Sequence, residues 1–207
     1  MTIRLKRIAA IVAVVALGAA TGFGLRVVLF GDASDRNSAR EGPGFGTALI
    51  GGPFELTDQN GARRSDVEFR GKLMLVFFGY TFCPDICPLS LQLVSDVLDG
   101  LGSDADKLAP IFVTVDPGRD KPAALKSYLE NFSPRIVGLT GSSEEVAATA
   151  KAYRAYFKLH GDPAKDEGYL VDHSTLIYLM GRDGKFLTQF THETPPERMA
   201  AAIRRYL

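Results

Sequence analysis

The continuous apolar run Leu73-Met74-Leu75-Val76-Phe77-Phe78 is followed, after Gly79-Tyr80-Thr81, by Phe82-Cys83-Pro84-Asp85-Ile86-Cys87-Pro88. A short apolar run bounded by glycines is typical of a strand that is buried on both faces. Pro88 suits the first turn of a helix, and apolar residues follow at helical spacing as far as Leu101. The stretch therefore predicts a strand, a turn and a helix, with the only two cysteines of the chain at the turn.

The remaining pattern alternates strands and helices before it ends in a hairpin and a last helix. We expect two hairpins, over 54–65 and 175–190, and two further strands, at 111–115 and 136–139. We also expect three further helices: one at 121–132, one from an N-cap at Ser143 to about 157, and one over 194–207. Early β-α units require a parallel core, and the late hairpin adds antiparallel strands. The sequence thus predicts an α/β, thioredoxin-like sandwich with an N-terminal hairpin.

The first 30 residues differ in composition from the rest. Arg4, Lys6 and Arg7 precede an apolar stretch over 8–25, which is close to the roughly 20 residues that span a bilayer. We expect residues 1–30 to be an uncleaved transmembrane anchor; a cleaved signal peptide is the alternative. Residues 31–52 are predicted to be a flexible tether and 53–207 the folded domain, which the positive-inside rule places outside the cytoplasm.

The charge balance argues against a nucleic-acid partner. Four of the 24 basic residues lie before position 31, where there is no acidic residue, so the exported part carries 20 basic and 24 acidic side chains. Such a part has no surplus of positive charge with which to bind phosphate backbones. Export also exposes the cysteine pair to oxidising conditions.

Cys83 and Cys87 support two chemistries. With three intervening residues they depart from the C-x-x-C pair of thiol-disulfide oxidoreductases. The helix start near Cys87 favours a thiolate, which both metal binding and disulfide exchange require. A purely structural disulfide is a third interpretation, but closing so small a loop stabilises a fold little.

A histidine could complete a metal site with the two sulfurs. His173 precedes a predicted strand, at a connection that faces the cysteine loop in thioredoxin-like folds. Two thiolates suit Cu(I), and an added imidazole makes a three-coordinate site for a soft ion. Zinc is the rival metal, and its tetrahedral site would also need His160 or His192.

Three segments of the chain resemble the signature segments of the SCO/SenC copper proteins. They are Gly79-Tyr80-Thr81-Phe82-Cys83-Pro84-Asp85-Ile86-Cys87-Pro88, Val113-Thr114-Val115-Asp116-Pro117-Gly118-Arg119-Asp120 and Val171-Asp172-His173-Ser174. Three motifs in the same order are a specific signal, and the resemblance covers about residues 50–207. Gly118 departs from the family, which commonly has Glu at this position.

The resemblance implies that Cys83, Cys87 and His173 bind copper, as Cu(I) and in some members also as Cu(II). It further implies a role in assembling the binuclear copper centre (CuA) of cytochrome c oxidase subunit II. Some members are thought instead to reduce the target cysteines. Asp116 and Asp172 are expected behind the ligands, as acceptors that orient His173 or tune Cu(II) binding, although Asp116 could equally serve only the turn with Pro117.

Two functions follow as hypotheses. The first is a membrane-anchored copper metallochaperone, expected to be monomeric, which receives copper from a donor protein and delivers it to subunit II without enzymatic turnover. The second is an enzyme, a thiol-disulfide oxidoreductase that acts on target cysteines without metal; a peroxidase ranks third. The short basic leader favours the bacterial inner membrane, with the domain in the periplasm, over the mitochondrial inner membrane.

Overall fold

Three parallel strands form the centre of a seven-stranded sheet in the computed structural model of this chain, which describes residues 49–161 and 168–207. They are β3 (Leu73–Gly79), β4 (Leu108–Thr114) and β5 (Val137–Thr140). Every residue of β3 and β4 is buried, as their unbroken apolar runs predict for strands covered on both faces. The two strands pair in register from Leu73 with Leu108 to Gly79 with Thr114, so their carboxyl ends lie together.

Antiparallel hairpins complete both edges of this sheet. Its strand order is β2-β1-β5-β4-β3-β8-β9, with β1 (Glu55–Asp58) and β2 (Arg63–Ser65) at one edge. At the other edge, β8 (Ile177–Met180) pairs antiparallel with β3 and with β9 (Phe186–Phe190). The predicted hairpins and the predicted parallel core are therefore confirmed.

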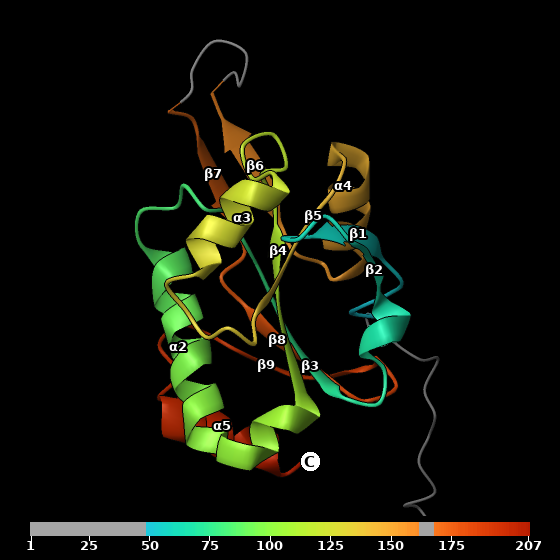
Figure 1. Cartoon of the computed structure of the whole chain (residues 1–207), viewed down its shortest axis with the longest axis vertical. Helices are drawn as coiled ribbons and strands as arrows, with labels where there is room; N and C mark the ends of the chain where they lie inside the picture. The colour runs from blue at the N-terminus through green and yellow to red at the C-terminus, as the bar shows by residue number, and fades with distance from the viewer. Residues whose placement is uncertain (1–48, 162–167) are drawn as a thin grey trace, which may run out of the picture. The chain divides into compact units, whose positions relative to one another are not determined.

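Within residues 49–161 and 168–207, four α-helices and two 3-10 helices flank the sheet (Figure 1). The α-helices are α2 (Ile86–Leu101), α3 (Pro122–Leu129), α4 (Ser143–Ala152) and α5 (Pro196–Arg204), and the 3-10 helices are η1 (Asp66–Phe69) and η2 (Gly102–Lys107). Helix α2 packs along α5, whereas α3 lies beside β5 and α4 beside β1. One face of α2 supplies the core with the apolar residues that its helical spacing predicted.

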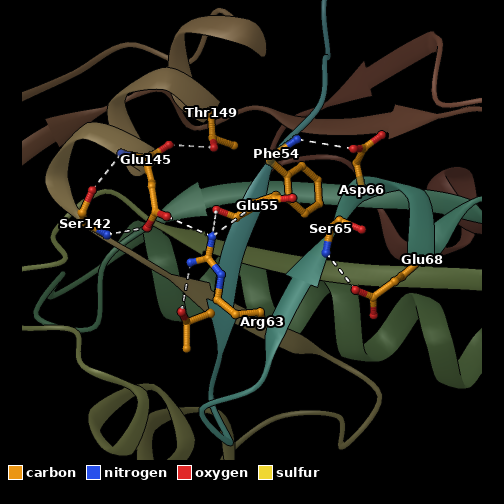
Figure 2. A network of polar contacts seen from close by, with 10 residues as sticks. Phe54, Glu55, Arg63, Ser65, Asp66, Glu68, Ser142, Glu145 and Thr149 are labelled. Carbon is orange, nitrogen blue, oxygen red and sulfur yellow. Dashed lines mark hydrogen bonds and ion pairs between the residues drawn. The ribbon is translucent and has the colours of Figure 1, made fainter.

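The start of α4 is one residue earlier than the sequence suggested. Ser142, not Ser143, is the N-cap: its hydroxyl accepts the Glu145 amide at 3.1 Å, and the Glu145 carboxylate accepts the Ser142 amide at 2.8 Å. Arg63 of β2 also donates to the Glu145 carboxylate at 2.9 Å. This network ties the first hairpin to the helix end, as Figure 2 shows.

A second, two-stranded sheet was not predicted. We expected the helix that begins at 143 to reach about residue 157, but Arg154 has a φ of 53°, which ends the helical path, and α4 stops at Ala152. The chain then forms β6 (Phe157–His160), which pairs antiparallel with β7 (Leu170–His173). In Figure 1 this hairpin extends from the end of the molecule at which α2 begins.

The predicted anchor, 1–30, and most of the predicted tether, 31–52, lie outside the described residues. Within the described ranges, no helix has the length and apolar character needed to cross a membrane. Residues 49–52 pack on the fold, because the Gly51 amide donates to the Ala152 carbonyl at 2.9 Å and Arg154 donates to the Leu49 carbonyl.

Candidate metal centre

Both cysteines lie where β3 passes into α2. Cys87 is the second residue of α2 and is fully buried, whereas Cys83 lies in the preceding loop and is half-buried. Both are free thiols. The Cys83 amide donates to the Tyr80 carbonyl at 3.3 Å, which turns the loop back on itself before the helix begins. Cys87 is thus part of the core, whereas Cys83 is partly exposed.

His173, the last residue of β7, completes the group. Its Nε2 lies 3.3 Å from the Cys87 sulfur, and its Nδ1 lies 2.9 Å from the Ser174 carbonyl oxygen. A carbonyl can only accept, so Nδ1 carries the ring proton and the Nε2 lone pair points at the sulfurs. The rings of Tyr80 and Phe77 hold the imidazole edge-on, with centroids 5.7 and 6.1 Å away.

The three ligand atoms all lie within 4.8 Å of one another. In the part of the chain that the structure describes, this is the one group of three or more His, Cys, Asp or Glu side chains placed to share an ion. Two sulfurs and one imidazole nitrogen form a donor set that suits a soft or borderline metal ion. The structure therefore brings together Cys83, Cys87 and His173, the three side chains that the sequence singled out.

Gly79 makes room for this arrangement. A Cβ atom at this position would lie 2.7 Å from the Cys87 sulfur and 2.9 Å from a ring carbon of Phe112. Both distances are shorter than van der Waals contact, and Gly79 ends a strand that is packed on both faces. The absence of a side chain at Gly79 is what allows the sulfur to sit against the end of β3.

Comparison with known proteins assigns the chain to a family. A model of the SCO1/SenC family matches residues 44–207. The chain belongs to the SCO1/SenC family. The match includes all three sequence segments on which the resemblance rested, and all three candidate ligands.

Relatives of this SCO1/SenC chain come from bacteria and eukaryotes. Human "Protein SCO1 homolog, mitochondrial" is 41% identical over 165 residues, which are 79% of this chain and 54% of the human protein, so the chain spans little more than half of that relative. Protein SenC of Rhodobacter capsulatus is 38% identical over 205 residues, which are 98% of this chain and 91% of SenC.

A solved structure shows the same fold. ScoI of Bradyrhizobium japonicum, determined with copper bound, is 51% identical and superimposes with a TM-score of 0.71, covering 76% of this chain and 99% of that structure. The mixed α/β, thioredoxin-like architecture predicted for this SCO1/SenC chain is therefore confirmed.

The electrostatics of the group favour one thiolate. A hydrogen bond from the Cys87 thiol holds the pKa of Cys83 well below the usual value of a thiol, although burial opposes this. The same hydrogen bond to Cys83, together with burial, raises the pKa of Cys87. The metal-free pair thus keeps one proton on the buried sulfur, and a metal ion that binds both sulfurs must displace it.

The hydrogen bonds of the Asp116 carboxylate go to residues other than His173. This carboxylate accepts the Tyr169 hydroxyl at 2.6 Å and the Arg119 Nε at 2.5 Å. The acceptor that orients His173 is the Ser174 carbonyl, so the direct contact expected from Asp116 is not present. A local backbone acceptor leaves no signal in the side-chain sequence, which is why sequence reasoning missed it.

Asp172 also points elsewhere. Its carboxylate pairs with His160 Nε2 at 2.5 Å on the exposed side of the hairpin. This contact occupies one of the two histidines that could have supplied the fourth ligand to zinc, and neither His160 nor His192 joins the group of three. A four-ligand zinc site is not built from the described residues.

Asp120 is a site-adjacent residue to which sequence reasoning gave no role. It is completely buried and accepts the Thr81 amide at 3.0 Å and the hydroxyls of Thr81 and Thr114, each at 2.5 Å. Burial raises the pKa of Asp120 even though these hydrogen bonds favour the carboxylate. The feature of the sequence that could have pointed to Asp120 was its position in the second of the three segments shared with the family.

Proposed function

We propose that this SCO1/SenC protein is a copper metallochaperone, which holds one Cu(I) on Cys83, Cys87 and His173 and passes it to the CuA site of cytochrome c oxidase subunit II. The observation that carries the proposal is the convergence of two sulfurs and one imidazole nitrogen within 4.8 Å. The copper-bound state of the related ScoI and the family resemblance support copper as the ion. Cu(II) is a second form that the same site could hold.

The unequal exposure of the two sulfurs suggests a direction of transfer. Cys83 is half-buried and Cys87 fully buried, so copper enters and leaves on the Cys83 side. An incoming target thiol forms a copper–sulfur bond as the bond to Cys83 breaks, and its proton passes to the released thiolate. Copper stays Cu(I) throughout, and coordination by Cys87 and His173 keeps it bound until a second target ligand arrives.

The proposal includes a place in the cell. Residues 1–30 would anchor the protein in the bacterial inner membrane and 31–52 would hold the domain on the periplasmic side, near the oxidase. Tethering both partners to one membrane raises the effective concentration of their encounter. A copper donor protein and a monomeric state belong to the same proposal.

Anaerobic titration of the reduced full-length chain with Cu(I), against a competing chelator, tests the binding step. One tightly held ion per chain is expected, and transfer to metal-free subunit II should then be detectable by mass spectrometry of both proteins. A reduced chain that loses Cu(I) to a moderate chelator would refute the copper function.

The lowered pKa of Cys83 favours one further candidate, a thiol-disulfide oxidoreductase. In that reaction a target disulfide gains two electrons and two protons while Cys83 and Cys87 lose them to form a disulfide. Stoichiometric reduction of the target disulfide by the reduced pair would vanish in Cys83→Ser and in Cys87→Ser but survive in His173→Ala. Loss of function in His173→Ala as well would instead support the copper function.

A further inference from the structure

The turn formed by residues 116–120 contacts both elements that carry the candidate ligands. It follows β4 and precedes α3, and none of its residues belongs to the group of three. On one side, Asp120 accepts the amide and the hydroxyl of Thr81, which lies two positions before Cys83. Thr114 donates to the same carboxylate, so Asp120 joins the end of β4 to the beginning of the cysteine loop.

Arg119 makes the second connection. Its guanidinium carbon lies 3.6 Å from the ring centre of Tyr169 and 4.7 Å from that of Phe82. Phe82 directly precedes Cys83, and Tyr169 directly precedes β7, the strand that ends at His173. Asp116 forms an ion pair with Arg119 and also accepts a hydrogen bond from the Tyr169 hydroxyl. The Asp116 side chain is almost completely buried, and its ion pair fixes the guanidinium against the two rings.

Cys83 needs such support more than the other two ligands do. Cys87 is held by α2 and His173 by β7, and regular hydrogen bonding fixes both. Cys83 lies outside any helix or strand, in a loop whose other residues include the exposed Phe82 and Pro84. A ligand on an irregular loop is placed only as accurately as its surroundings hold that loop.

We propose that the 116–120 turn positions Cys83, with Arg119 and Asp120 as positioning residues that hold the cysteine loop against the Cys87–His173 pair. This inference rests on the proposed copper function. The positioning role explains why the second signature segment, residues 113–120, lies beside the metal site although it supplies no ligand. The turn lowers the cost of metal binding by ordering the third ligand in advance.

Arg119→Leu tests the proposal in the reduced full-length chain. Its affinity for Cu(I) should fall at least about 10-fold, or ~1.4 kcal/mol. Arg135→Leu is the matched control, because Arg135 also forms a 2.5 Å ion pair with an aspartate, Asp106, but lies just before β5, at the opposite end of the parallel strands. Arg119→Lys keeps the charge but not the flat stacking surface, and should bind as weakly as Arg119→Leu. Full affinity in Arg119→Lys would overturn the positioning role in favour of charge alone.

Thr81→Val tests the other connection with little change in shape. It removes one hydroxyl donor to Asp120 and should lower Cu(I) affinity in the same direction as Arg119→Leu. Its control is Thr140→Val, since the Thr140 hydroxyl is buried without a hydrogen-bond partner among the described residues. Equal affinities in the two valine variants would contradict the proposal.

A double-mutant cycle shows whether Arg119 acts through Cys83. In a Cys83→Ser background only Cys87 and His173 remain, and adding Arg119→Leu should change affinity less than 2-fold. The full 10-fold loss in that background would overturn the assignment, because the effect would then be independent of Cys83.

Amide hydrogen exchange of the reduced, metal-free chain separates this inference from the proposed function. Exchange over residues 81–86 should be at least 10-fold faster in Arg119→Leu and unchanged in Arg135→Leu. If wild-type protein failed to hold copper, the copper function would fall, yet faster exchange would still support positioning of the loop. Unchanged exchange in Arg119→Leu would overturn the positioning role whatever the copper result.

Discussion

The Nε2 atom of His173 lies 3.3 Å from the sulfur of Cys87, although 86 positions separate the two residues in the chain. Cys87 is held by the first turn of α2 and His173 by the end of β7, so two independent elements set this distance. A pair that two separate elements hold at contact distance needs little rearrangement to take up an ion.

His173→Ala should therefore lower Cu(I) affinity by about 100-fold or more, since loss of a ligand exceeds the 10–100-fold effect typical of residues behind the ligands. The measurement is chelator competition on the reduced chain. His160→Ala is the control: His160 lies on the same hairpin, is exposed and pairs with Asp172 rather than with the sulfurs. Equal losses in the two variants would show that the hairpin matters only as a whole.

Gly79→Ala should destabilise the fold and weaken copper binding together. The added Cβ would lie 2.7 Å from the Cys87 sulfur, and such overpacking costs about 1–3 kcal/mol. Urea unfolding and Cu(I) competition measure the two effects. In the control Gly100→Ala, the new Cβ meets nothing within 4 Å and lies inside α2, so stability should rise by about 0.5–1 kcal/mol. A neutral Gly79→Ala would show that the sulfur can move aside freely.

Ser142→Ala should lower the stability of the fold by about 1 kcal/mol, because the N-cap hydroxyl that accepts the Glu145 amide is lost. Ser143→Ala, one position later and within the first turn, should change stability by no more than a few tenths of a kcal/mol. Thermal or urea unfolding measures both. The reverse ranking would return the helix start to Ser143, the residue that the sequence pattern suggested.

The stability of the β1–β2 hairpin should depend on pH through Asp58. Burial favours the protonated form, but hydrogen bonds from the Ala62 and Asn60 amides and from Arg64 outweigh it, so the pKa of the Asp58 carboxyl lies below its ordinary value of 3.8. A lowered pKa contributes stability above pH 3.8 that is lost as the pH falls through the folded-state pKa.

Asp58→Ala should accordingly cost about 2 kcal/mol at pH 7 and progressively less as the pH falls below 3.8. Urea unfolding at pH 7 and at a series of pH values below 3.8 gives the difference. Asp106→Ala, which removes a mostly exposed carboxylate, is the control and should change stability little at any of these pH values. A cost for Asp58→Ala that is independent of pH would assign the effect to packing instead of charge.

Local pattern was sufficient for most of the fold. The apolar runs that became β3 and β4 have only one favourable arrangement, with both faces covered, and Pro88 with the apolar spacing after it defines α2. The hairpins over 54–65 and 175–190 carried their own turn residues. In each case the residues that decide whether a strand, helix or turn forms lie within a few positions of one another in the chain. These elements can therefore be predicted without knowing which distant segments they pack against.

The β6–β7 hairpin shows where local pattern fails. Lys158, Leu159 and His160 have no strong strand signal, and their partners lie in 170–173, beyond the intervening loop. Pairing across such a distance is decided by the rest of the fold, not by propensity. The same holds for Asp116: the sequence left its role open between the turn with Pro117 and a place behind the ligands, and its contact with Tyr169, 53 positions away, depends on the rest of the fold.

The sequence by itself indicated the chemistry of this SCO1/SenC protein, because Cys83 and Cys87 are its only thiols and the motifs around them and around His173 are specific. It also determined the order of the core elements, through apolar periodicity. Tertiary structure alone decided the distances within the group of three, and that the 116–120 turn contacts the cysteine loop. These choices depend on contacts between residues tens of positions apart, and such contacts form only when the whole sheet is assembled.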